Sequence, residues 1–197
     1  MNLGFLASHR GSNMQAVVAA CRAGALAANP VVLICNNRSA EALARAEAQG
    51  VTAVVLNAAT HPDPDMLDSA MLEILQRHGC DVIVLAGFMK KIGPRVLAAY
   101  ADRIINIHPS LLPKHGGRGM YGRAVHEAVL TAGDHVTGVT VHLVNAEYDE
   151  GRILAQGEVP VRPGDTVDAL AARVLAQEHA FLVGTLQRIA DGRLKIG

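Results

Sequence analysis

The chain has 197 residues, 50% of them hydrophobic and 18% charged, and its 18 Lys and Arg residues balance 18 Asp and Glu residues. This composition excludes a disordered or fibrous protein and, because it shows no basic excess, argues against nucleic-acid binding. The longest apolar runs, such as residues 82–89, are too short to span a bilayer, so we expect a core-rich globular protein that is not bound to membranes.

The first half of the chain alternates apolar strands with amphipathic helices. Strands are predicted at 3–8, 31–36, 53–57, 81–87 and 103–108, and helices at 12–23, 39–49, about 65–78 and just after Pro94. Continuous runs of β-branched residues between helices are typical of parallel strands that are covered on both faces. The fold class is therefore α/β, with a mostly parallel twisted sheet and helices on both faces.

The second half begins with a Pro/Gly-rich loop. The elements expected after this loop are a helix at 121–132, strands at 138–145 and 152–161, and a final helix at about 166–190. Within the first of these strands Thr140 and His142 alternate with apolar residues, which predicts one partly polar face. No repeat or linker interrupts the chain. We expect one domain over residues 1–197, with an N-terminal lobe of about 1–100 and a C-terminal lobe of about 101–197.

The cysteine and histidine patterns favour neither a disulfide framework nor a metal site. Cys21, Cys35 and Cys80 are odd in number and lie in apolar or helical contexts. His126-Glu127 is not followed by the second histidine of a zinc-binding helix, and His115 has no partners at metal-ligand spacing. From these patterns we expect a protein without a metal. No apolar secretory segment lies near the start, so we also expect a cytoplasmic protein.

The stretch SHRGSNMQ at residues 8–15 follows the first predicted strand and opens a helix. Ser12 and Gln15 have the spacing of a capping box, and a capped helix is one interpretation. The other is an anion site, because the free N–H groups of Gly11, Ser12 and Asn13 at the positive end of a helix can hold a phosphate. The stretch matches neither a nucleotide triphosphate loop nor a dinucleotide fingerprint.

Two polar residues interrupt the apolar strand IINIH at residues 104–108. The period of two places Asn106 and His108 on one face, where the strand ends and where open α/β sheets bind ligands. An amide can donate to a developing oxyanion, and an imidazole can move a proton near neutral pH. The alternative is a polar pair that only hydrogen-bonds to the backbone.

A turn after the strand at 138–145 carries Asp149 and Gly151. A carboxylate beside His108 would raise the pKa of the imidazole and favour its protonated form, so we predict that Asp149 lies near His108. The alternative is an ordinary turn aspartate. His142 is better interpreted as a satisfied strand histidine.

These stretches together resemble the folate-dependent formyltransferases, and among them the branch that formylates glycinamide ribonucleotide (GAR). The matching segments are GSN at 11–13, VIVLAGFMKKIGP at 82–94, NIHPSLLPKHGG at 106–117, GVTVHLVNAEYDEG at 138–151 and AQEHA at 176–180. The resemblance implies a Rossmann-like formyltransferase fold. It also implies an enzyme that transfers the formyl group of 10-formyltetrahydrofolate, as cosubstrate, to the amine of GAR in purine (IMP) biosynthesis.

The resemblance also assigns roles to individual residues. It implies that Asn106, His108 and Asp149 are catalytic, with Asn106 and a protonated His108 stabilising the oxyanion. The residues expected to bind GAR are Gly11, Ser12, Asn13 and Glu178, the last through the ribose. The residues expected to bind the folate are Met89, Lys90, Lys91 and Ile92, through their backbone, together with Asn106.

Some positions depart from the family pattern. Pro64 stands where some members carry an arginine for the folate glutamate tail, and Leu175 stands where a Lys or Gln often contacts GAR. Arg118 or Tyr121, in the loop before the helix at 121–132, are candidates to compensate. The resemblance leaves open an acceptor other than GAR, such as a sugar-nucleotide amine, or a non-catalytic binding module. The protein is expected to act as a monomer or homodimer.

Overall fold

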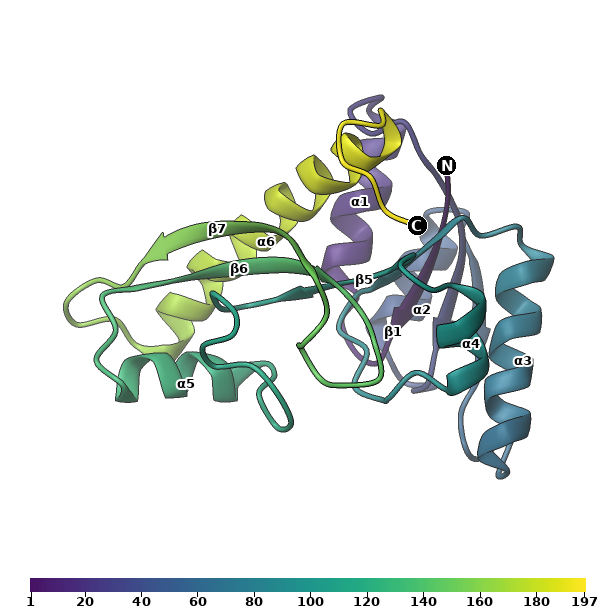
Figure 1. Ribbon diagram of the computed structural model, residues 1–197, viewed down its shortest axis with the longest axis horizontal. Coiled ribbons are helices and arrows are strands. Elements are labelled where there is room, and N and C mark those ends of the chain that lie inside the picture. Colours follow the sequence, from purple (N-terminus) through teal and green to yellow (C-terminus); the bar gives the residue numbers. More distant parts are fainter.

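One seven-stranded sheet runs through the molecule (Figure 1). The computed structural model describes all 197 residues. The strands are β1 (Asn2–Ala7), β2 (Asn29–Cys35), β3 (Thr52–Val55), β4 (Val82–Leu85), β5 (Ile104–His108), β6 (Val136–Leu143) and β7 (Ile153–Pro160). Their order is β3-β2-β1-β4-β5-β6-β7, and all neighbours from β3 to β5 are parallel. The predicted α/β class with a mostly parallel sheet is confirmed.

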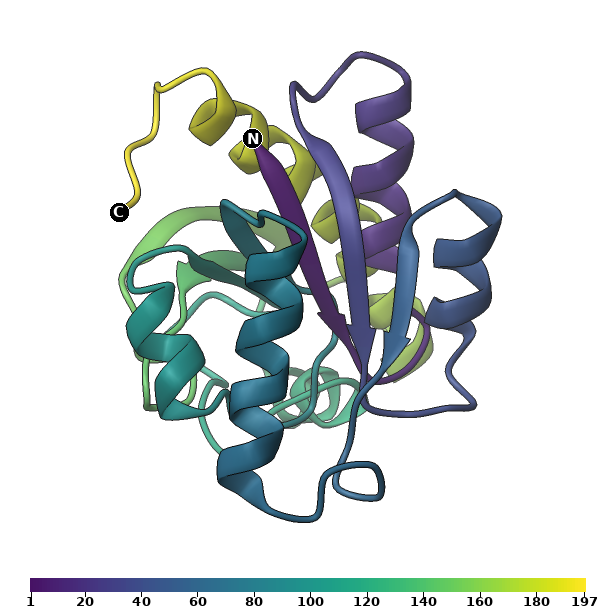
Figure 2. The same ribbon diagram turned by 90° about the vertical axis from the view of Figure 1, so that its right-hand side faces the viewer.

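Helices cover both faces of the sheet. They are α1 (Ser12–Arg22), α2 (Glu41–Ala48), α3 (Pro64–Arg77), α4 (Pro94–Ala99), α5 (Arg123–Thr131) and α6 (Val167–Ala190). One hydrophobic cluster contains residues of α1, α2, α5 and α6, and a second contains residues of α3 and α4. Figure 2 shows α1 and α2 on one side of the parallel strands and α3 on the other.

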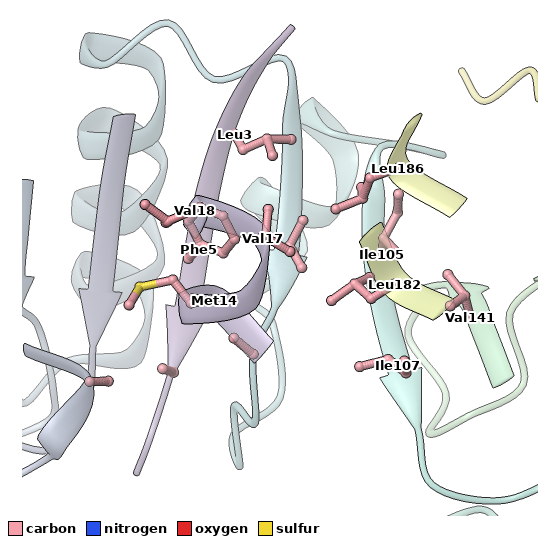
Figure 3. Close-up of a cluster of buried hydrophobic side chains, with 14 of the residues drawn as sticks. Leu3, Phe5, Met14, Val17, Val18, Ile105, Ile107, Val141, Leu182 and Leu186 are labelled. Carbon is pink, nitrogen blue, oxygen red and sulfur yellow. The ribbon is translucent and has the colours of Figure 1, made fainter. Parts of the chain in front are cut away.

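Each face of the central strand β1 serves one of these clusters. Leu3 and Phe5 belong to the larger cluster, whereas Leu6 belongs to the smaller one, as the period of two in a strand requires. Figure 3 shows the larger cluster, in which Leu3 and Phe5 lie beside side chains of α1 such as Met14 and Val17. Because both faces are buried from Leu3 to Ala7, this part of β1 is uniformly apolar, whereas the polar Asn2 lies at the partly exposed start of the strand.

The sheet changes direction at β5. This strand is parallel to β4 but antiparallel to β6, with Asn106 opposite His142 and His108 opposite Thr140. The polar face predicted for β6 therefore lies on the same side of the sheet as the polar face of β5, next to it. Both Thr140 and His142 are buried, and the backbone of the loop that follows β5 hydrogen-bonds to Thr140.

The predicted capping box at the start of α1 is wrong. The N-cap residue is Gly11 in the left-handed conformation, with φ 65°, and no side chain caps the helix. A Cβ atom at Gly11 would meet the Cβ of Ala42 at 2.7 Å, so a glycine is required both by the conformation and by the close approach of α2. Ser12 becomes the first helical residue, and Gln15 instead contacts Arg45 of α2.

None of the helices combines the length and the apolar character that a membrane span requires.

Candidate active site

A cavity of about 670 Å³ opens at the carboxyl ends of β4 and β5. Its lining contains most of the residues that the sequence singled out, namely Asn13, Met89, Lys90, Lys91, Ile92, Asn106, His108, Asp149 and Glu178. Gly11 and Ser12 do not line it; they lie just before Asn13 at the start of α1. Parallel strands bring their carboxyl ends to one edge, which is why these distant segments meet there.

Asn106 is held by a histidine on the neighbouring strand. Its Nδ2 atom lies 3.1 Å from Nε2 of His142, while Nδ1 of His142 lies 2.8 Å from the carbonyl oxygen of Leu143. A carbonyl only accepts, so Nδ1 carries the proton and Nε2 offers a lone pair to the amide. One N–H of Asn106 is thus engaged by His142, and its second N–H stays free for the cavity.

His108 is buried and is held from both sides of its ring. Its Nε2 atom donates to the carbonyl oxygen of His115 at 2.8 Å, and its Nδ1 atom lies 3.5 Å from Oδ2 of Asp149. The proximity of Asp149 and His108 predicted from the sequence is therefore confirmed. In the neutral ring the lone pair of Nδ1 faces the Asp149 carboxylate. Protonation of Nδ1 therefore creates an N–H group whose charge the carboxylate stabilises.

The protonation states differ from the sequence expectation. Burial lowers the pKa of His108, and the Asp149 carboxylate and the His115 carbonyl offset only part of that effect. The expectation that Asp149 raises the pKa of His108 above its ordinary value is wrong in its net direction, because desolvation of the imidazolium prevails. Burial also opposes ionisation of Asp149, but His142, His108 and the Gly117 amide outweigh it and lower the pKa of the carboxyl group.

The turn that carries Asp149 has a strained and closely packed backbone. Asp149 has φ 59°, a left-handed conformation that few non-glycine residues adopt, and its Oδ2 accepts a hydrogen bond from the Gly117 amide at 2.9 Å. A Cβ atom at Gly151 would lie 1.7 Å from the carbonyl oxygen of Leu143, so the D-x-G pattern reflects a glycine that packs against β6. The turn therefore aims the carboxylate into the cavity between His108 and His142.

The segment after β4 presents backbone groups to the cavity. The Met89 amide donates to Oγ of buried Ser8 at 2.8 Å, which fixes the start of the segment. The backbone groups of Lys90, Lys91 and Ile92 make no hydrogen bond to the rest of the protein. The Lys91 ammonium also lies 5.3 Å from the ring centre of Tyr148, a cation–π contact between this segment and the turn of Asp149.

The other end of the cavity is the start of α1. The first hydrogen bond of this helix joins the Gln15 amide to the Gly11 carbonyl, so the earlier amides have no intrahelical partner. Asn13 donates through Nδ2 to Oε2 of Glu178 at 3.1 Å, and its Oδ1 has no partner although it is buried. Burial raises the pKa of Glu178 to about 7, which the bond from Asn13 partly opposes.

Sequence reasoning missed part of this arrangement. The expectation that His142 is a satisfied strand histidine is confirmed, because both of its ring nitrogens have partners. The sequence did not indicate that one partner is Asn106, or that Nε2 lies 3.5 Å from Oδ1 of Asp149. The contacts that His115 and Gly117 make to His108 and Asp149 come from backbone atoms, which carry no residue-specific signal. The contact between His142 and Asn106 can be recognised only from the antiparallel register of β5 and β6, which places the two residues opposite each other.

Comparison with known proteins adds a family to this geometry. Residues 1–186 match the sequence model of the family described as formyl transferase. Over 196 residues the chain is 37% identical to the phosphoribosylglycinamide formyltransferase of Escherichia coli, covering 100% of this chain and 90% of that protein. It is 38% identical over 194 residues to the chloroplastic phosphoribosylglycinamide formyltransferase of Arabidopsis thaliana, covering 98% of this chain and 66% of that protein.

A solved structure shares the fold as well as the sequence. The crystal structure of glycinamide ribonucleotide transformylase 1 from Symbiobacterium toebii superposes with a TM-score of 0.93 at 39% identity, covering 100% of this chain and 91% of that one. The architecture around the cavity is therefore one that this group of proteins shares.

Proposed function

Because the chain belongs to the formyl transferase family, we propose that it transfers the formyl group of 10-formyltetrahydrofolate to the amine of GAR in de novo purine biosynthesis. The observation that carries the proposal is the meeting of Asn106, His108 and Asp149 in one cavity. That cavity also reaches the start of α1, so acid–base chemistry and a phosphate site lie in one space. A binding module alone would need no buried proton carrier beside a carboxylate.

Asn106 supplies the oxyanion contact in this proposal. Attack of the neutral GAR amine on the formyl carbon forms a C–N bond and places negative charge on the formyl oxygen. The N–H of Asn106 that His142 leaves free is the donor for this charge, and it is already oriented before substrate arrives. An oriented donor costs no reorganisation in the transition state, which is why such a contact accelerates the reaction.

His108 carries the proton between the two nitrogens. Its lowered pKa makes the imidazole neutral in the resting enzyme, so Nδ1 accepts the proton that the GAR nitrogen loses. Asp149 then stabilises the imidazolium that forms. The same proton passes to N10 of the folate as the bond from N10 to the formyl carbon breaks and the carbonyl re-forms. This order replaces the protonated resting His108 expected from the sequence.

The two substrates enter from opposite ends of the cavity. We place the GAR phosphate at the amides of Gly11, Ser12 and Asn13 and its ribose against Glu178, supported by the unpartnered amides and by the bond from Asn13 to Glu178. The folate takes the free backbone groups of Lys90 to Ile92. Lobes of about 1–100 and 101–197, a cytoplasmic location, and a monomer or homodimer stay predictions.

The deciding experiment supplies both substrates to the purified protein and follows the folate absorbance. We expect turnover that requires GAR and 10-formyltetrahydrofolate together. Parallel reactions replace GAR with a sugar-nucleotide amine or with water alone. Turnover only with the sugar-nucleotide amine would refute the GAR acceptor while keeping formyl transfer, and release of formate without any amine would refute transfer itself.

A further inference from the structure

The loop between β5 and α5 is fastened to the sheet beneath it. Oγ1 of Thr140 on β6 accepts from the Leu112 amide at 3.0 Å and donates to the Ser110 carbonyl at 2.7 Å. Nε2 of Gln156 on β7 donates to the Leu112 carbonyl at 2.9 Å. These bonds fix residues 110–112, and Ser110 and Leu111 in turn bond the backbone of Lys114. The next residue, His115, has an additional side-chain anchor of its own.

That anchor is the side chain of His115. Its Nε2 atom lies 2.7 Å from Oδ2 of Asp134, in the turn after α5, and the same carboxylate pairs with the exposed ammonium of Lys114. The side chains of His115 and Asp134 are 13% and 12% exposed, so this pair is largely shielded from water. His115 has φ 54°, a left-handed conformation that its side chain disfavours, and the bond to Asp134 holds it there.

The backbone next to this anchor contacts both catalytic side chains. The His115 carbonyl accepts from Nε2 of His108 at 2.8 Å, and the Gly117 amide donates to Asp149 at 2.9 Å. A Cβ atom at Gly116, between them, would lie 2.4 Å from Cδ2 of Leu112. The segment 115–117 therefore packs tightly in the one position where its carbonyl and its amide reach His108 and Asp149.

We propose that Asp134 and His115 form a positioning pair that sets the tautomer of His108. A carbonyl acceptor at Nε2 keeps the proton of the neutral ring on that nitrogen, which leaves the lone pair on Nδ1, the atom that faces Asp149. Loss of the anchor releases the left-handed backbone of His115, and the carbonyl leaves Nε2. The neutral ring then distributes between both tautomers, and the fraction ready to accept a proton at Nδ1 falls. The proposal rests on the function proposed above only for its effect on rate.

The test combines nitrogen NMR of the histidine rings with steady-state kinetics on the full chain. The signals of His108 are assigned by their absence in His108→Gln. Asp134→Ala removes the anchor, and Asp134→Asn keeps an oxygen that accepts from Nε2 of His115. Lys114→Ala is the matched control, because it removes the other partner of Asp134 and leaves His115 in place. His115→Asn is a second variant, since asparagine tolerates the left-handed conformation but is too short to reach Asp134 as histidine does.

In the wild type and in Lys114→Ala we expect His108 to carry its proton on Nε2. In Asp134→Ala and His115→Asn we expect both tautomers and a kcat lowered by about 10-fold to 100-fold, with each KM within about twofold, as for a misplaced catalytic group. Asp134→Asn should recover most of both readouts. A single unchanged tautomer in Asp134→Ala and His115→Asn overturns the proposal, whether or not kcat falls. Failure of the wild type to use GAR refutes the proposed function instead and leaves the tautomer result intact.

Discussion

The amide of Asn106 is oriented by His142, its direct neighbour across the antiparallel pair of β5 and β6, with 3.1 Å between Nδ2 and Nε2. Because His142 has its proton on Nδ1, the lone pair on Nε2 selects the NH2 end of the asparagine rather than its oxygen. A residue of the neighbouring strand thus determines which group Asn106 presents to the cavity.

Replacing His142 should therefore lower the rate, because the Asn106 amide loses its orienting partner. His142→Leu leaves the Asn106 amide free to rotate, and we expect kcat to fall by about 10-fold to 100-fold, less than the loss of an oxyanion donor itself. The exposed His135 provides the control: His135→Leu should keep the wild-type kcat. Equal rates for His142→Leu and wild type would show that Asn106 needs no orienting partner.

His108 and Asp149 should be separable from substrate binding. His108→Ala and Asp149→Asn are each expected to lose most of kcat while they still bind GAR, because neither residue contacts the phosphate end of the cavity. Binding is measured by calorimetry with GAR and turnover by folate absorbance. A near-wild-type rate in either variant would remove that residue from the proton path.

The pH profile should report the ionisation of His108. Its pKa is lowered from 6.5 by burial, so the neutral base persists below that value. Once the loss caused by protonation of the GAR amine is divided out, the remaining acidic limb of kcat/KM should lie below pH 6.5. Asp149 opposes the lowering, so in Asp149→Asn the residual activity should have its acidic limb at still lower pH. Ionisation of the GAR amine is common to both enzymes, and the difference between their profiles isolates His108. A limb that moves to higher pH would contradict this assignment.

Glu178 should make folding stability depend on pH near neutrality. Burial raises its pKa from 4.5 to about 7, so its favourable contribution is full below 4.5 and is lost as the pH rises through about 7. Glu178→Gln lacks this loss. Urea unfolding at about pH 5 and about pH 8 should show the wild type losing about 2 kcal/mol more than the variant between them, at roughly 1.4 kcal/mol per pKa unit.

The same substitution tests the proposed ribose contact. Gln keeps an oxygen that accepts from Asn13 but no longer offers a carboxylate, so we expect the KM for GAR to rise and the KM for folate to stay unchanged. In the urea experiment, a difference in unfolding free energy between the wild type and Glu178→Gln that is the same at both pH values would show that Glu178 is ionised in the folded protein throughout this range. An unchanged KM for GAR would remove Glu178 from the binding site.

Gly11, at the start of α1, and Gly24, in a surface turn, have similar left-handed backbone conformations. Substitutions at the two positions therefore distinguish the effect of backbone strain from the effect of packing. Gly11 has φ +65° with Ala42 against it, while Gly24 has φ +72° with no atom within 4 Å of an added Cβ. Gly24→Ala should cost about 1 kcal/mol in unfolding free energy and leave the KM for GAR unchanged. Gly11→Ala must also displace α1 from α2, so the KM for GAR should rise. A phosphate-soaked crystal should show the anion at residues 11–13, and density elsewhere alone would count against this site.

Much of this molecule could be predicted because its local patterns are strong. The apolar runs of β1, β2 and β4 can be interpreted only as buried strands, and the period of two in a strand places Asn106 and His108 on one face. The capping-box interpretation of the start of α1 is wrong although Ser12 and Gln15 have the right spacing. The N-cap is Gly11, and its contact with Ala42 depends on how α2 packs. Local sequence does not contain that packing.

The net protonation of His108 was beyond prediction for a similar reason. The sequence supplied the carboxylate that raises its pKa, but the burial that lowers it more strongly is a property of the assembled fold. The pairing of His142 with Asn106 could not be predicted because the register of β5 and β6 is set across a connection that contains α5 rather than by a tight hairpin.

At one end of the cavity the lining comes from both α1 and α6. Asn13 finds its partner Glu178 only when α6 lies against α1, side by side in Figure 1. In the sequence the parallel strands β1 to β5 precede α6, so during synthesis they leave the ribosome before it. A nascent chain can therefore hold much of its sheet while Glu178 is still absent from the site. Docking of α6 against α1 is therefore the step that brings the carboxyl group of Glu178 beside Asn13 and completes this end of the site.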